Sequence, residues 1–433
     1  FILYDRVKTN HLIKQSNDSL LTQLNNKYIS QKSQLGLLYE KSINEIEYEN
    51  LRLSKKEDQL SNLELDINKL LSNFKEINKQ YKWLDIRNKL KPNEAYLEII
   101  KVVSSNKDTI SIFDSSDQYT EEWQLNTSYL IIIIKNDQIV PEFVVLNNGN
   151  FLENEAYKYY LSHNAKKKRL DNFSYKHYWS KIDEKMTNIN KIYVTLEGVF
   201  SEINLKTLYD VNTDVFLNDK FQIQYLFSSR DLLEKRNKSV DISKNSIALF
   251  GYPEFDLINP KNQQIINNEE DDLSLLSRGY KIKSLPGTFE EVLNIKNLAE
   301  SNQWNVSLYT DLDATENNIK SINSPTVLHL ATHGYRIDNQ DIENSDKVVH
   351  GFDKKLFENN KNPLLKSGLY FAGASNTLNK EELNHENNGI FTAFEASNLS
   401  LNETELVVLS ACETALGHYR LGEGVYGLPR SFI

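Results

Sequence analysis

The stretch Leu406-Val-Val-Leu-Ser-Ala-Cys412-Glu-Thr-Ala-Leu-Gly417 is a short apolar run that ends in small and polar residues. Its β-branched residues and its closing glycine predict a strand buried on both faces of a parallel sheet. Functional groups of open α/β sheets gather at the carboxyl ends of such strands. Cys412, the only cysteine of the chain, stands at this end and is therefore a candidate nucleophile.

A second run of the same kind, Val327–Tyr335, ends in His333 followed by Gly334. Taken alone, a thiol is often a small buried hydrophobic group and a histidine is often a satisfied core residue. A thiol and an imidazole that both follow buried strands favour a catalytic pair instead, because an imidazole that accepts the thiol proton activates the nucleophile. The backbone N–H groups of Gly334 and Cys412 are the candidate oxyanion hole.

Four further residues near these runs are candidates for a minor role. His329 precedes His333 by four positions, which share one side of a strand. We favour a structural role for it, because its neighbours are buried leucines. Glu413, Glu395 and Glu423 are candidates for lining the substrate pocket or orienting the strand end, and the alternative for each is a hydrogen-bonded structural carboxylate.

The remaining histidines are scattered, and none has a partner at metal-ligand spacing. The glycines around Gly422–Gly427 lack the Lys-Ser/Thr continuation of a phosphate-binding loop. We therefore expect no metal and no cofactor.

Composition narrows the class of protein. A chain of 433 residues is long enough for two or three domains. Its net charge of −10 argues against direct nucleic-acid binding, and one cysteine excludes an internal disulfide, which favours the cytoplasm. The longest apolar run, 129–134, is too short to span a membrane, and no signal peptide is apparent. The chain starts at Phe1 and has one methionine, so we expect it to be a piece of a longer protein.

Residues 1–91 read as a helical region. Apolar residues recur there in steps that alternate between three and four: Leu60, Leu63, Ile67, Leu70, Phe74, Ile77, Tyr81 and Leu84. This heptad pattern predicts a long helical hairpin. The alternative is the end of a helical repeat array that recruits a partner, although no 34-residue repeat can be established in so short a stretch.

Residues 92–244 alternate strands and helices. Pro92 is predicted to open a helix through Ile100. Residues 129–135 and 139–146 form a predicted hairpin, in which Pro141 indicates an edge strand. Strands at 191–196 and 221–227 follow, and this part has no counterpart of the His-Gly or Cys motifs.

Residues 245–433 form the third predicted domain. The expected elements are a strand that begins at about Asn245 and ends in Gly251-Tyr252-Pro253, strands at 306–309 and 368–372, one strand in each of the two apolar runs described above, and helices at 287–300, 315–322 and 389–397. This alternation indicates an α/β fold with a mostly parallel sheet sandwiched by helices. The polar segment 336–363, directly after His333, is a candidate lid.

The chain resembles the CHAT domain, a caspase-like module in the same clan of cysteine peptidases as separase. The resemblance is carried by His329-Leu-Ala-Thr-His333-Gly, by Leu406-Val-Val-Leu-Ser-Ala-Cys412-Glu-Thr and by Gly422-Glu-Gly-Val-Tyr-Gly-Leu428. Weaker matches are Ile203-Asn-Leu-Lys-Thr-Leu208, Ser284-Leu-Pro-Gly-Thr288 and Asn388-Gly-Ile-Phe-Thr-Ala-Phe-Glu395. The motifs follow the order of the family over roughly residues 92–433.

The resemblance implies a caspase-like sheet with His333 as general base and Cys412 as nucleophile on adjacent strands. It also implies that residues 92–244 are a catalytically silent caspase-like half. The wording Ser-Ala-Cys412-Glu-Thr departs from the signature of caspases proper, so their preference for aspartate before the cleaved bond is not implied.

The function implied is a bacterial, cytoplasmic cysteine endopeptidase that acts on a protein substrate. Relatives of this type carry helical repeats such as tetratricopeptide repeats and act in antiphage defence, linked to CRISPR effectors or to gasdermin-like proteins. A regulatory partner acting through the N-terminal helices is therefore expected. The alternative is a non-proteolytic scaffold that keeps the fold, and a hydrolase of small molecules is disfavoured because the motifs match a peptidase family.

Overall fold

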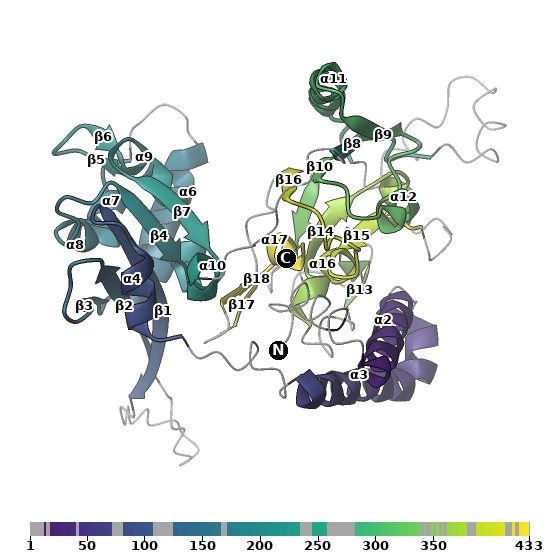
Figure 1. The fold of residues 1–433 in the computed structure, drawn as a ribbon, viewed down its shortest axis with the longest axis horizontal. Helices are drawn as coiled ribbons and strands as arrows, with labels where there is room; N and C mark the ends of the chain where they lie inside the picture. Colours follow the sequence, from purple (N-terminus) through teal and green to yellow (C-terminus); the bar gives the residue numbers. More distant parts are fainter. Residues whose placement is uncertain are drawn as a thin grey trace, which may run out of the picture. The chain divides into compact units, whose positions relative to one another are not determined.

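A computed structural model describes residues 13, 18–39, 43–71, 81–106, 124–165, 171–233, 245–257, 282–337, 342, 348–349, 352–354, 357, 362–378, 387–411, 418–420 and 424–432. The chain divides into two compact units (Figure 1). Unit 1 comprises Phe1–Lys79, Ser239–His418 and Tyr426–Ile433, and unit 2 comprises Gln80–Lys238 and Tyr419–Val425. The three-domain division at residues 91 and 244 stays a prediction.

Unit 2 is built on a five-stranded mixed sheet in the order β3-β2-β1-β4-β7. Its strands are β1 (Glu94–Asn106), β2 (Gln124–Lys135), β3 (Glu142–Leu146), β4 (Lys191–Thr195) and β7 (Gln222–Leu226). One face packs on a core that includes Ile131, Trp179 and Phe200. The opposite face contacts the short helices α4 (Trp83–Lys89) and α10 (Ser229–Leu233) through Tyr96 and Ile134.

The predicted helix from Pro92 to Ile100 is wrong, because this segment forms β1. β1 pairs with β2 in antiparallel register along its length and with β4 in parallel. Ala95, Leu97 and Ile99 join the core on one face and Tyr96 joins the core on the other, so successive side chains alternate between the faces as in a strand. The hairpin of β2 and β3 is confirmed, and β3 is the edge strand that Pro141 indicates.

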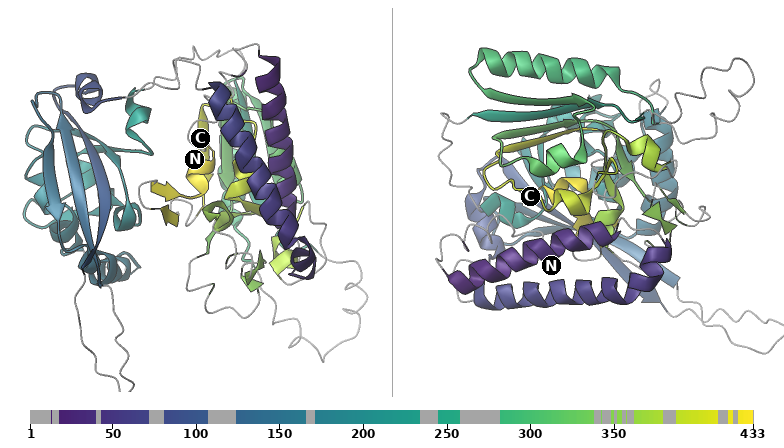
Figure 2. Two further views of the ribbon diagram at one scale, coloured as in Figure 1. Left: turned by 90° about the horizontal axis from the view of Figure 1, so that it is seen from below. Right: turned by 90° about the vertical axis from the view of Figure 1, so that its right-hand side faces the viewer.

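Unit 1 is built on a four-stranded sheet in the order β16-β10-β8-β9, in which every neighbouring pair is parallel. The strands are β8 (Ser246–Pro253), β9 (Asn305–Asp311), β10 (Val327–Ala331) and β16 (Leu406–Ser410). Helix α11 (Pro286–Ser301) covers one face, as Figure 2 shows. There Val292 packs on Leu249 and Ala331, all fully buried.

The other face of this sheet carries the main hydrophobic core of unit 1 among the described residues. Phe250, Leu328 and Leu330 pack there in one cluster with Ile319 of α12 (Glu316–Ser321) and with Phe394 of α16 (Ala393–Ala396). A parallel sheet with helical cover on both sides agrees with the predicted α/β class. The predicted burial of the cysteine strand on both faces is wrong, because β16 is an edge strand of the described sheet: Leu406 is 52% exposed and the rest of the strand is half-buried.

An antiparallel sheet of β11 (Gly334–Arg336), β14 (Ser367–Tyr370) and β15 (Ile390–Thr392) lies between the histidine strand and β16 in the sequence. The predicted helix at 389–397 is therefore only partly correct. Ile390 and Phe391 pair with β14, and Thr392 ends the strand by capping α16.

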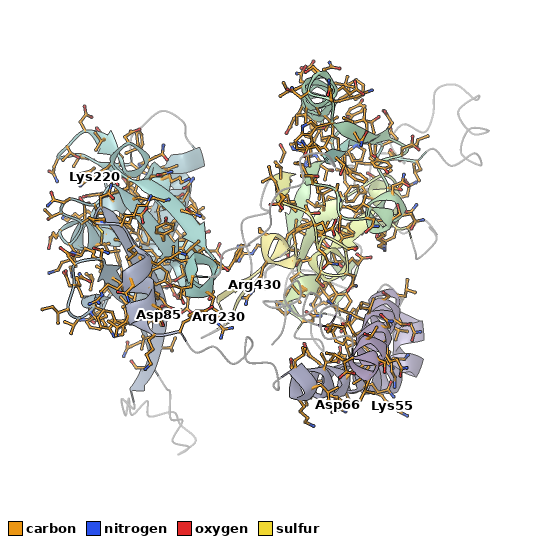
Figure 3. The ribbon with its side chains drawn as sticks, in the orientation of Figure 1. Lys55, Asp66, Asp85, Lys220, Arg230 and Arg430 are labelled. Atoms are coloured by element: carbon orange, nitrogen blue, oxygen red, sulfur yellow. The ribbon has the colours of Figure 1, made fainter. Side chains whose placement is uncertain are left out.

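The N-terminal region contains α2 (Ser19–Tyr39) and α3 (Ile43–Leu71), which lie side by side (Figure 2). Leu63 and Ile67 of the heptad pattern are buried, whereas Phe74 and Ile77 lie outside the described residues. Lys55 and Asp66 project outward from α3 (Figure 3). Within the described ranges, none of the helices has both the length and the apolar character that crossing a membrane requires.

The remaining elements are short. They are α5 (Gly149–Phe151), η1 (Leu152–Ala156), α6 (Tyr157–Ala165), α7 (Ser174–Tyr178), α8 (Ser180–Asp183), η2 (Gly198–Ser201), η3 (Leu205–Thr207), β5 (Tyr209–Asp210), β6 (Val215–Phe216), α9 (Leu217–Lys220), β12 (Val348–Val349), β13 (Phe352–Asp353), η6 (Pro363–Leu365), α15 (Ala374–Leu378), β17 (His418–Arg420), β18 (Gly424–Tyr426) and α17 (Leu428–Ser431).

Candidate active site

The two strands that precede the candidate pair are neighbours in the sheet of unit 1. β10 and β16 run parallel, with Val327 opposite Leu406 and Ala331 opposite Ser410. His333 follows Ala331 by two positions, and Cys412 follows Ser410 by two positions. The register therefore brings the carboxyl ends of both strands to the same edge of the sheet, which is where α/β proteins place their reactive groups.

Cys412, Glu413 and Glu423 lie outside the described residues, so their predicted roles stay predictions. The candidate lid at 336–363 is described only in short pieces, and its role is likewise untested. The geometry of the site is therefore that of His333 and its surroundings.

The ring of His333 is half-buried and is held from two sides. Its Nε2 atom lies 2.8 Å from the carbonyl oxygen of Lys283, just ahead of α11. The ring of Phe255, which follows β8, lies 5.6 Å away between centroids. The backbone carbonyl of His333 also accepts a hydrogen bond of 2.9 Å from the N–H of Tyr370. Both the ring and the backbone are thus oriented before any substrate arrives.

The contact with Lys283 determines the tautomer of His333. A carbonyl oxygen only accepts hydrogen bonds, so Nε2 must carry the hydrogen. In the neutral imidazole, Nδ1 is then the unprotonated nitrogen, and it is the atom able to accept a proton. In other nucleophile–base pairs, too, the base is oriented by a third group that accepts a hydrogen bond from its second nitrogen.

The N–H of Gly334 points away from β14. Tyr370 donates to the carbonyl of His333, and Ile337 donates to the carbonyl of Lys366. Hydrogen-bonded pairs alternate with non-bonded pairs along an antiparallel ladder, so Gly334, which stands opposite Leu369, belongs to a non-bonded pair. Its N–H is therefore directed toward the other edge of β11, as a member of an oxyanion hole requires.

His329 lies deeper in β10 and is 5% exposed. Its Nε2 atom is 2.9 Å from Oε1 of Glu291 on α11. The other carboxylate oxygen of Glu291, Oε2, accepts a hydrogen bond of 3.1 Å from the hydroxyl of Ser410 on β16. One carboxylate thus connects both strands that lead to the candidate pair.

Glu395 lies at the first turn of α16, where its carboxylate accepts hydrogen bonds from the N–H (2.8 Å) and hydroxyl (2.9 Å) of Thr392. Its other oxygen forms an ion pair of 2.6 Å with Lys320. These contacts account for a buried carboxylate without a ligand, and its part in a substrate pocket stays a prediction.

Lys320 also pairs with Glu316, which is fully buried and accepts a hydrogen bond of 2.6 Å from the N–H of Gly389. Burial, reinforced by the nearby charge of Glu395, raises the pKa of Glu316 to about 8. Neighbouring acidic groups in a buried site oppose ionisation of one another, so the charge of Glu395 acts on the pKa of Glu316 in the same direction as burial, and Lys320 acts against both.

Two site residues were not predicted from the sequence. Lys283 contributes only a carbonyl oxygen, for which no side-chain pattern gives a signal. Glu291 lies shortly after Ser284-Leu-Pro-Gly-Thr288. In the sequence it differs from the exposed Glu290 only in being next to Val292, an apolar residue that proves to be buried. Among the described residues, no group of three or more histidine, cysteine, aspartate or glutamate side chains is arranged to hold a metal ion.

The model of the CHAT domain matches residues 174–433, more than half of the chain. The match contains β10, β16 and the residues His333 and Cys412, and it begins within unit 2, at α7. The earlier start expected at residue 92 stays a prediction. Comparison with curated proteins finds no match.

Proposed function

The chain belongs to the CHAT-domain family, and we propose that it is a cytoplasmic cysteine endopeptidase that cleaves a protein substrate with His333 and Cys412. The observation that carries the proposal is the parallel register of β10 and β16, whose ends lead to these two residues. A caspase-like, protease-related fold makes peptide cleavage the chemistry to test first.

In the proposed reaction, Nδ1 of His333 accepts the proton of the Cys412 thiol. The thiolate attacks the carbonyl carbon of the scissile peptide bond, and the N–H groups of Gly334 and Cys412 stabilise the oxyanion. The C–N bond then breaks, and the leaving amine takes the proton from His333. Water hydrolyses the thioester to a carboxylic acid and restores the thiol.

The tautomer of His333 supports this assignment. Because Nε2 donates to the carbonyl of Lys283, the ring cannot present a hydrogen at Nδ1 while it is neutral. A scaffold protein has no need of a base oriented in this way, so the arrangement favours an enzyme over the non-proteolytic alternative.

We also propose that a protein partner regulates the site through α2 and α3, in the antiphage setting that the resemblance implies. Lys32 of α2 donates a hydrogen bond of 2.8 Å to the hydroxyl of Ser397, directly after α16. The edge of Tyr39 packs on Phe394 with ring centroids 5.3 Å apart. The segment that follows α16 leads to β16, so a partner that moves α2 would act on residues that lie shortly before the cysteine strand in the chain.

The proposal of proteolysis is tested by a cleavage screen in cells that express either the wild type or Cys412→Ala. Mass spectrometry of newly formed protein N-termini should find sites that occur only with the wild type and that also disappear in His333→Ala. His163→Ala, which changes a histidine of unit 2, is the matched control and should retain these sites. If wild-type and Cys412→Ala cells yield the same N-termini with the regulatory partner present, the proposed peptidase activity is wrong.

A further inference from the structure

We infer that Glu291 is a positioning residue, whose carboxylate holds the ends of β10 and β16 in the register that the Cys412–His333 pair needs. The inference rests on the proposed function, because it assigns a role in preparing that same site. Glu291 lies on α11, outside both strands, and is separated from each of its partners in the sequence.

The contacts of Glu291 connect the two strands directly. Oε1 contacts Nε2 of His329 at 2.9 Å, and Oε2 accepts from the hydroxyl of Ser410 at 3.1 Å. His329 precedes His333 by four positions, and Ser410 precedes Cys412 by two. The side chain of His329 is 7% exposed and that of Glu291 is 33% exposed, so the imidazole depends on this carboxylate as its acceptor more than the carboxylate depends on the imidazole.

Helix α11 is itself seated firmly on the sheet, so its carboxylate is a fixed reference. A Cβ atom on Gly251 of β8 would lie 2.7 Å from Cγ1 of Val292, which shows how closely the helix approaches. The hydroxyl of Thr288 accepts a hydrogen bond of 2.9 Å from the N–H of Tyr252. The segment before this helix supplies the Lys283 carbonyl that orients the His333 ring.

One continuous segment, residues 283–291, therefore contacts the base, the strand that leads to the base and the strand that leads to the thiol. A misplacement of about 1 Å between reacting groups lowers rates on the order of a hundredfold. Removing the carboxylate leaves a buried imidazole and a hydroxyl without their shared acceptor, so the relative position of the two strand ends is expected to relax.

The test uses the fact that the chain has a single cysteine, so alkylation by iodoacetamide reports on Cys412 alone. The rate is measured against pH on the full chain. A thiol paired with His333 reacts with a midpoint below the value of a free thiol, about 8.5. In Glu291→Ala the midpoint should rise toward that value, and the rate near pH 7 should fall about tenfold.

Two matched variants separate positioning from a general loss of structure. Glu291→Gln keeps an acceptor for His329 and a donor for Ser410, so it should restore most of the wild-type behaviour. Glu290→Ala removes the adjacent, exposed carboxylate of the same helix and should leave the midpoint unchanged. Circular dichroism and Tm establish that each variant is folded.

Each outcome decides one of the two hypotheses. If the wild type already has the midpoint of a free thiol and His333→Ala does not change it, the proposed pair is wrong. If the wild-type midpoint is low, depends on His333 and is unchanged in folded Glu291→Ala, the pair stands and the positioning role is wrong. If Glu291→Ala does not fold, Ser410→Ala removes only the contact with β16; an unchanged midpoint there overturns the inference.

Discussion

At the scale of single residues, the protonation of His333 governs the proposed chemistry. Its Nε2–H is committed to the carbonyl of Lys283, so Nδ1 is the position that gains or loses the proton. A base acts only in its unprotonated form. The carbonyl contact remains possible in both forms of the ring, so the orientation of His333 should persist when its charge changes.

Peptide cleavage is therefore expected to fall on acidification, as His333 becomes protonated and no longer accepts the thiol proton. The measurement is the pH dependence of kcat/KM between about pH 5 and 8. A flat profile over this range would count against the assignment of His333 as the base.

Glu316 is expected to make the stability of unit 1 depend on pH. Its pKa is raised from 4.5 to about 8, so the folded protein binds this proton more tightly than the unfolded chain does. The free energy of unfolding should therefore decrease as the pH rises through that interval. Glu316→Gln can still accept from the N–H of Gly389 and should weaken this dependence, with a Tm equal to or above that of the wild type near pH 8.

The control for this comparison is Glu290→Gln, which changes an exposed glutamate of unit 1. It should show the same dependence of Tm on pH as the wild type. Equal slopes for the wild type and Glu316→Gln between about pH 5 and 8 would show that Glu316 is not the group responsible.

At the scale of elements, the site depends on how α11 and α16 sit against the parallel sheet. Helix α11 carries Glu291, and the segment before it supplies the carbonyl of Lys283. Helix α16 and the residue after it contact α2 through Phe394 and Ser397. For the position of the site residues, the close packing of α11 on β8 and of α16 on α2 matters more than the length of either helix. Substitutions of Gly251 and Gly287 test the packing of α11 on the sheet, and substitution of Lys32 tests the packing of α2 on α16.

Gly251→Ala is expected to destabilise unit 1 by about 1–3 kcal/mol, because the added Cβ would lie 2.7 Å from Val292 and 2.9 Å from the carbonyl of Thr288. Gly287→Ala is the control on α11 itself, where no atom lies within 4 Å of the added Cβ. The control should be neutral or slightly stabilising. Denaturant unfolding measures both, and an equal loss in the two variants would contradict the close approach of α11.

Lys32→Ala is expected to weaken the packing of α2 on α16 by about 1–3 kcal/mol, because Ser397 and Phe394 lose their contacts with the buried ammonium group. Limited proteolysis within α2 should become faster, and the rate of Cys412 alkylation should change if the helices regulate the site. Lys27→Ala, on an exposed position of the same helix, should do neither. Unchanged proteolysis in Lys32→Ala would show that this contact does not hold α2.

At the scale of the whole molecule, the chain has two compact units with separate cores. Ile131 lies in the core of unit 2 and Leu330 in the largest core of unit 1, and both are fully buried. Truncation of a buried aliphatic side chain to alanine costs about 2–5 kcal/mol. Each substitution should lower the free energy of unfolding of the unit that contains the residue.

Calorimetry of Ile131→Ala and Leu330→Ala should thus show two different unfolding transitions lowered, one in each variant, because each unit has a hydrophobic core of its own. The double variant should show both changes added together, since residues in separate cores share no packing partners. A single transition lowered by both substitutions would mean that the units unfold as one.

Much of the α/β unit was predictable from the sequence, because buried parallel strands are continuous apolar runs that need no distant partner to be identified. Both apolar runs contain strands, β10 and β16, and the His-Gly pair and the single thiol follow them in the sequence. The sequence did not indicate that β16 would be a half-buried edge strand, because that depends on which strands pair with it. The error at residues 92–100 has a related cause. Pro92 signals a helix start locally, whereas the strand that forms there is selected by pairing with β2 and β4, which lie far along the chain.

The sequence by itself determined the family, the parallel α/β class and the candidate pair, because these follow from residue types at short spacings. Only the tertiary structure decided that β10 and β16 are neighbours in matched register, that a backbone carbonyl at Lys283 selects the tautomer of His333, and that Glu291 connects the two strands. The physical reason is that hydrogen bonds between distant segments depend on three-dimensional distance and direction, which no local pattern of side chains encodes.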